Sequence, residues 1–221
     1  MGYRCVATSV AGFVQQLAVA YVANGYWFYV KGWIPDTKDP AKTDAKIIAQ
    51  YNLDVSKWTR ARQKKAGQAS VQYLRHGRFY VIVATHGEHP FFAAEGKQIR
   101  DLRRSPLHFH GYSIGCRKGR DGQWHASVRI ARERFVELKT HFAHLALQRS
   151  VEALVGELRR LAFEPYAPVR DQLRGLVRLV NRRRHAAGLE LLPQDAVFWR
   201  RRPVRPFAAP SEIAALEEKQ T

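Results

Sequence analysis

The spacing of apolar residues changes character near residue 131. Before that point, short apolar and aromatic runs such as 79–85 alternate with segments rich in glycine, proline and charged residues. Runs of this length with β-branched and aromatic content are typical of strands. Beyond it, Phe135, Leu138 and Phe142 recur at the intervals that place side chains on one face of a helix. The sequence therefore predicts an α+β fold in which a sheet region precedes a helical C-terminal portion.

Residues 1–130 are predicted to form a mixed, mainly antiparallel sheet with helices. Apolar patterning and turn residues predict strands at 3–9 and 26–34, helices at 10–23 and from Pro40, and hairpins at 71–85 and 111–130. The run at 79–85 is continuously apolar, so we expect it to be a central strand. A βαβ opening of this kind is found in ferredoxin-like and related folds, and we expect such an order here.

Residues 131–190 are predicted to form a helical portion that packs on the sheet region. A helix is expected from residue 131, a second one capped by Ser150, and a third over 168–187 that ends at Gly188. The remaining residues, 191–221, are first rich in arginine and proline and then in alanine and glutamate. We expect them to form a basic and then flexible tail.

A large excess of positive charge separates this chain from ordinary globular proteins. Its 37 Lys and Arg against 19 Asp and Glu leave a net charge of +18, more than a domain of this size needs for solubility. A field of that sign attracts polyanions such as nucleic acid. No apolar run reaches the roughly 18 residues needed to span a bilayer, and the two cysteines form no paired zinc motif. The sequence therefore predicts a cytoplasmic, nucleic-acid-binding protein with no membrane partner.

The predicted helix at 168–187 carries arginine at every fourth position. Side chains at this spacing stack on one side of a helix, and guanidinium groups suit phosphate oxygens. A solvated polar face usually mixes acids with bases, whereas Asp171 is the only acid here, so we expect contacts with phosphate. The predicted contact residues of this helix are Arg170, Arg174, Arg178, Arg182, Arg183 and Arg184.

Two further clusters combine basic and aromatic residues. One contains Trp58, Arg60, Arg62, Lys64 and Lys65, and the other contains Arg200, Arg201 and Arg202 directly after Phe198 and Trp199. Such clusters neutralise the phosphate backbone and offer rings for base stacking. No helix-turn-helix signature is present, so we expect single-stranded or structured nucleic acid, with RNA and DNA both open.

One triplet, His108-Phe109-His110, is a candidate catalytic motif. Two histidines at i and i+2 on a strand project from one face and can hold a divalent cation. The triplet resembles the His-hydrophobe-His motif of the HUH nickases and transposases. That resemblance implies Mg²⁺ or Mn²⁺ bound by His108 and His110 as a Lewis acid, and Tyr166 as the nucleophile that attacks a DNA phosphate.

Three functions therefore remain open. The first is a non-catalytic nucleic-acid-binding subunit of a mobile-element, plasmid or ribonucleoprotein system, with possible protein partners. The second is the metal-dependent nickase, and the third is a small metal-independent endoribonuclease with a histidine base. The chain has no Walker loop, GxGxxG or GxSxG motif, which argues against an NTPase, a dinucleotide enzyme and a serine hydrolase.

Overall fold

The computed structural model describes residues 3–197 and 204–208, apart from the side chain of Lys57. These residues form two compact units. Among the described residues, the first unit contains 3–106, 115–126 and 204–208, and the second contains 107–114 and 127–197. The predicted domain boundaries at residues 130 and 190 remain predictions. No helix among the described residues is both long and apolar enough to cross a membrane.

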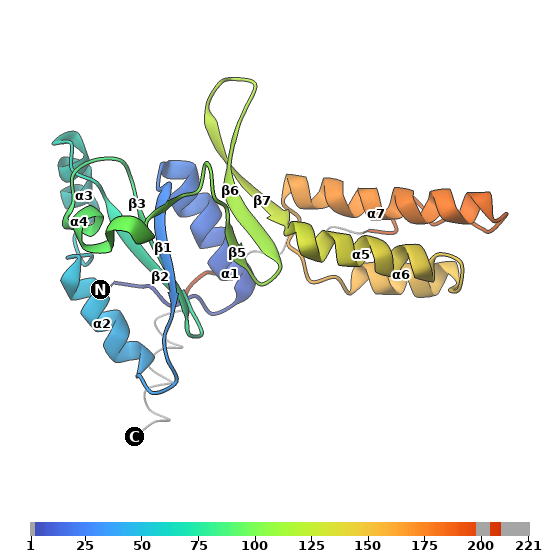
Figure 1. The fold of residues 1–221 in the computed structure, drawn as a ribbon, viewed down its shortest axis with the longest axis horizontal. Helices are drawn as coiled ribbons and strands as arrows, with labels where there is room; N and C mark the ends of the chain where they lie inside the picture. The colour runs from blue at the N-terminus through green and yellow to red at the C-terminus, as the bar shows by residue number, and fades with distance from the viewer. Residues whose placement is uncertain (1–2, 198–203, 209–221) are drawn as a thin grey trace. The chain divides into compact units, whose positions relative to one another are not determined.

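A four-stranded sheet organises the first unit (Figure 1). Its strands are β1 (Phe28–Trp33), β2 (Val71–His76), β3 (Phe79–Ala84) and β4 (Arg100–Asp101), in the order β2-β3-β1-β4. Ile82 of β3 lies opposite Tyr73 of β2 and Val30 of β1. The predicted hairpin at 71–85 is confirmed, and so is the central place of its apolar second strand.

The N-terminal segment differs from the predicted strand at 3–9. Among the described residues of this segment only Val6 pairs, through one parallel bridge to Arg75. A βαβ unit requires two parallel strands within a sheet, whereas β1 pairs antiparallel with both of its neighbours. The α+β class is therefore confirmed, and the ferredoxin-like order is not.

Short helical segments connect and cover these strands. They are α1 (Val10–Gln15), the π-helix η1 (Gln16–Tyr21), the 3₁₀ turn η2 (Val22–Asn24), α2 (Pro40–Gln50), α3 (Lys57–Lys65), α4 (Pro90–Glu95) and the 3₁₀ turn η3 (Gly96–Gln98). The predicted helix at 10–23 is confirmed and ends at Gly25, whose φ of 90° suits glycine. Pro40 begins α2 as predicted, behind an Asp39 cap. The basic segment after residue 57 forms α3, which begins behind a Ser56 cap.

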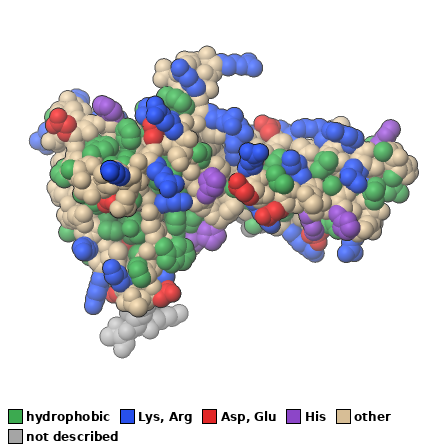
Figure 2. All heavy atoms as spheres, viewed as in Figure 1, with side chains coloured by type: hydrophobic (Ala, Val, Ile, Leu, Met, Phe, Trp, Pro, Cys, Tyr) green, Lys and Arg blue, Asp and Glu red, His purple; other side chains and the backbone are tan. Residues whose placement is uncertain are grey.

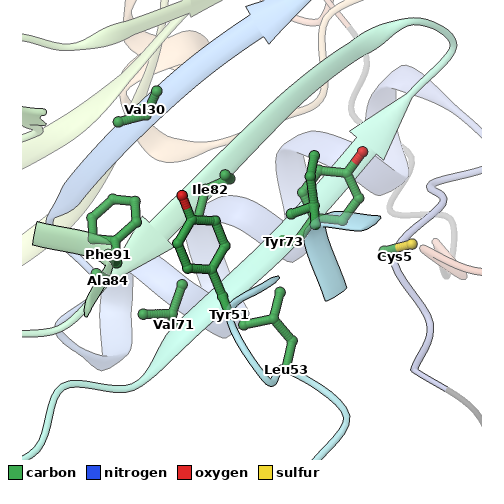
Figure 3. Close-up of a cluster of buried hydrophobic side chains, with 10 residues drawn as sticks. Cys5, Val30, Tyr51, Leu53, Val71, Tyr73, Ile82, Ala84 and Phe91 are labelled. Atoms are coloured by element: carbon green, nitrogen blue, oxygen red, sulfur yellow. The ribbon is translucent and has the colours of Figure 1, made fainter. Parts of the chain in front are cut away.

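Both faces of the sheet are covered, α1 lying on one side and α2 with α4 on the other (Figure 1). On the first face, the ring of Phe13 in α1 meets that of Phe79 at a centroid distance of 5.8 Å. Figure 3 shows the second face, where Tyr51 and Phe91 pack with Ile82 among other buried side chains. Because successive strand residues point to opposite faces, this double cover explains why β3 is continuously apolar.

A short segment near the C-terminus joins the first unit. The amide of Thr8 donates to the Pro206 carbonyl at 3.0 Å, and the side chain of Gln15 donates to the Val204 carbonyl at 3.4 Å. A Cβ atom at Gly12 would lie 3.0 Å from Pro206 Cα, so glycine permits this close approach. Residues 204–208, which the sequence places in the tail, therefore lie against α1.

Three helices and part of a second sheet make up the second unit. The sheet has the order β5-β6-β7, from β5 (Leu107–Phe109), β6 (Tyr112–Lys118) and β7 (Trp124–Ile130), and the last two strands continue into the first unit. The helices are α5 (Arg132–Leu145), α6 (Val151–Arg159) and α7 (Ala167–Ala186). The predicted hairpin at 111–130 and the Ser150 cap of α6 are both confirmed.

A buried ion pair joins α2 to β2. Asp44 is 7% exposed and accepts hydrogen bonds from the Tyr73 hydroxyl at 2.6 Å and from Nε and Nη2 of Arg75 at 2.8 and 2.7 Å. Asp36 and Arg78 form a comparable pair at 3.0 Å, but the Asp36 side chain is 92% exposed. The two pairs differ mainly in burial, which decides what the loss of a carboxylate costs.

We expect Asp44→Ala to lower the free energy of unfolding by about 3–5 kcal/mol, because it leaves the Arg75 charge buried without its partner. Asp36→Ala is the matched control and should lower it by less than about 1 kcal/mol. Urea denaturation of both variants measures the difference. Equal losses would contradict a structural role for the buried pair.

Candidate nucleic-acid interface

Helix α7 presents an apolar stripe to the core and arginines to solvent. Its buried residues include Leu173 and Leu176, at the spacing that lines one side of a helix. On another side, Arg174, Arg178 and Arg182 are exposed and follow one another at every fourth position. Figure 2, in which Lys and Arg share one colour, shows basic side chains along this helix. The predicted helix and its row of arginines are both present.

The exposed arginine side chains of α7 make few contacts with the described residues. Arg178, Arg182 and Arg183 form no ion pair or hydrogen bond with any described residue. Arg174 lies 3.3 Å from a carboxylate oxygen of Asp171, but both side chains are more than half exposed, so this pair contributes little. The guanidinium groups are therefore accessible to an external anion.

Arg184 has a different environment from its neighbours. It is 4% exposed, and its guanidinium donates to the carbonyl oxygens of Ala146 at 2.9 Å, Arg149 at 2.8 Å and Glu190. These bonds satisfy two carbonyl groups that follow the end of α5 and one that follows the end of α7. Because these three bonds engage the guanidinium of Arg184, we leave Arg184 out of the proposed interface. Arg170 is half-buried, and its Nε has no hydrogen-bond partner within the described part of the chain.

The second predicted cluster lies on α3, in the first unit. Trp58 is 79% exposed, which is unusual for so large an apolar side chain. Arg62, Lys64 and Lys65 are exposed as well. Arg60 is half-buried, and its Nη1 donates to the Val55 carbonyl at 2.9 Å. The third predicted cluster, Arg200, Arg201 and Arg202 with Phe198 and Trp199, lies outside the described residues.

The two histidines of the candidate catalytic motif do not share a strand face. His108 is exposed on β5, but β5 ends at Phe109, and His110 lies in the following turn with φ of 44°. The prediction that both project from one strand face is therefore wrong, because the chain turns one residue earlier than expected. Within 3–197 and 204–208, no three His, Cys, Asp or Glu side chains gather where they could hold a metal ion.

Tyr166 precedes the first turn of α7. Burial raises the pKa of its hydroxyl, and the nearby Tyr112 and Glu164 raise it further. The Tyr112 hydroxyl accepts a hydrogen bond from the Glu164 amide at 2.8 Å, and its ring meets that of Phe163 edge-on. A raised pKa disfavours the phenolate, which is the nucleophilic form. Tyr166 is half-buried, and its raised pKa does not favour its use as a nucleophile.

The sequence analysis did not single out three lysines, of which Lys42 and Lys46 lie on α2 and Lys38 lies just before it. Lys38, Lys42 and Lys46 line a pocket of about 480 Å³, whose other walls include Tyr80 and Glu95. The four-residue spacing of Lys42 and Lys46, which places them on one side of a helix, was visible in the sequence. The pocket that they share forms because the sheet brings Tyr80 close to α2. No local sequence pattern reveals this long-range contact.

Comparison with known proteins gives no match. No family model matches it, and neither a curated protein nor a solved structure is significantly similar to it. The fold and surfaces define an α+β protein with exposed basic clusters on α3 and α7. Its function has to be argued from these surfaces.

Arg184 and Arg182 allow the stability contributed by a buried arginine to be compared with that of an exposed arginine on the same helix. We expect Arg184→Gln to lower the free energy of unfolding by about 2–4 kcal/mol, because buried carbonyls lose their donor. Arg182→Gln should change it by no more than about 0.5 kcal/mol, since this side chain is exposed. Urea denaturation checks both, and a stable Arg184→Gln variant would return that residue to the list of candidate phosphate contacts.

Proposed function

We propose that the protein binds single-stranded or structured nucleic acid, and that the exposed arginine row of α7 contacts the phosphate backbone. The observation that carries this proposal is the accessibility of Arg174, Arg178 and Arg182 at every fourth position of one helix. Their guanidinium groups can each donate two parallel hydrogen bonds to phosphate oxygens. Affinity of this kind comes mainly from counterion release, so it depends steeply on salt.

Two further observations support the proposal. The net charge of +18 draws polyanions toward the protein from a distance. The basic surface of α3 adds the exposed ring of Trp58, which suits stacking with an unpaired base. In this proposal the protein acts in the cytoplasm as a binding subunit of a mobile-element, plasmid or ribonucleoprotein system, without a membrane partner.

The triple variant Arg174→Gln, Arg178→Gln, Arg182→Gln tests the proposed contact. We expect it to bind a single-stranded oligonucleotide about tenfold more weakly or worse, uniformly across sequences. The slope of log affinity against log salt should fall by about 2, since each lost phosphate contact on a single strand removes roughly 0.7. Fluorescence anisotropy titrations at several salt concentrations measure both quantities.

A second triple variant, Arg149→Gln, Arg159→Gln, Arg160→Gln, is the matched control. It removes the same charge from exposed arginines of the same unit but leaves α7 intact. We expect its salt slope to stay near that of the unmodified protein. If both variants lose the same affinity and slope, binding depends on overall charge, and the α7 row is not the contact surface.

The nickase and the endoribonuclease are the alternatives, and one assay separates them from binding. We expect labelled single-stranded DNA and RNA to remain intact with Mn²⁺ and with EDTA. A covalent DNA adduct that requires metal and disappears in Tyr166→Phe would establish the nickase instead. RNA cleavage that survives EDTA would establish the endoribonuclease.

A further inference from the structure

A polar pocket of about 460 Å³ lies beside β2 in the first unit. Its volume is within the range of roughly 300–1,000 Å³ in which proteins bind small ligands. The N-terminal segment, the π-helix η1, the start of α3 and the segment at 204–208 each contribute side chains to it. Segments from distant parts of the sequence thus build a single pocket.

Aromatic rings form much of its wall. Tyr21 and Tyr26 meet with ring centroids 5.5 Å apart, and Tyr3 and Phe207 also line the pocket. The Tyr26 hydroxyl is held 2.8 Å from Ser70 Oγ, which fixes the orientation of its ring. A π-helix is rare and often occurs at functional sites, and here η1 brings Tyr21 to the pocket. Rings in this setting can stack on a planar base.

A side-chain amide of β2 opens onto the same pocket. Gln72 of β2 lines it and is only 7% exposed. Its Oε1 accepts a hydrogen bond from the Tyr3 hydroxyl at 3.1 Å, but its amide nitrogen donates to none of the described residues. Because Gln72 lines the pocket, this donor is available to a ligand there. The edge of a nucleobase supplies acceptors of the right kind.

Two guanidinium groups complete the arrangement. Arg4 is exposed, and its guanidinium carbon lies 5.5 Å from the centre of the Phe207 ring. Arg60 lines the pocket and uses Nη1 to bond the Val55 carbonyl, which leaves its other donors for a ligand. Asp54 adds an acceptor suited to a ribose hydroxyl or a base amino group.

We infer that this pocket binds one nucleotide, with the base among the tyrosine rings and the amide of Gln72, and the phosphate on Arg4 and Arg60. The inference deepens the proposed function and rests on it for the choice of ligand. Arg60 belongs to α3, so a strand bound along the exposed basic residues of that helix passes close to the pocket. The nucleotide is then either a unit of that strand or a free mononucleotide.

Titration of the full chain with nucleoside 5′-monophosphates, by calorimetry, tests the pocket directly. We expect binding that weakens at least about tenfold in Arg4→Gln, Arg60→Gln, because the phosphate loses charged donors. Ala20→Leu adds volume inside the pocket without changing charge, and it should weaken binding to a similar degree. Arg117→Gln, Arg120→Gln is the control, since it removes two exposed charges from the β6–β7 hairpin and should leave binding unchanged.

The second arm uses a short single strand with the fluorescent base aminopurine at one position. Quenching that Ala20→Leu abolishes, with strand affinity retained, identifies a nucleotide of the strand as the ligand. Monophosphate binding without quenching identifies a free mononucleotide and also supports the pocket.

If the pocket variants alter neither readout while salt-dependent strand binding persists, the pocket inference is wrong and the proposed function stands. If only monophosphates bind, and the pocket variants weaken that binding, the proposed function falls and the pocket stands.

Discussion

Burial of β3 on both faces is the constraint on which the first unit depends. A strand whose successive side chains are all apolar can be stable only between two covering layers. Phe79, Val81 and Val83 point to one face, where α1 packs, and Ile82 points to the other, toward α2. The same requirement holds the helix at 10–24 against β2, and thereby brings the π-helix beside Gln72. The polar pocket is thus a consequence of how the core is covered.

Position in the fold decides what each arginine does. Arg182 and Arg184 are two residues apart on α7, yet one is exposed and the other is bonded to three main-chain carbonyls. Helical periodicity explains the difference, since a step of two residues turns the side chain by about 200°. Arg184 therefore does not belong to the row of arginines at every fourth position. The composition of the segment alone does not distinguish Arg184 from the arginines of that row.

Periodic and local features of this chain were predictable from sequence, and features that depend on long-range contact were not. The hairpin at 71–85, the Pro40 helix start and the Ser150 cap each follow from a few neighbouring residues, and all are present. The predicted strand at 3–9 was wrong, because this segment makes one isolated bridge to β2 and no continuous ladder. The predicted position of His110 on the strand was wrong because the turn begins one residue earlier than expected. A shift of one residue decides which face of a sheet a side chain meets. The pocket joins residues 3 to 207, which no local pattern brings together.

The exposed arginine row and the polar pocket suit different physical tasks. A row of guanidinium groups on a helix neutralises phosphate whatever the base, so it supplies affinity and salt dependence without sequence preference. In the proposed pocket, the aromatic rings and the Gln72 amide would contact a single base. The row lies in the second unit and the pocket in the first. Under the two proposals, the second unit would bind a strand of any sequence, and the first unit would select one nucleotide. The combined affinity would then depend on the chain that links the two units.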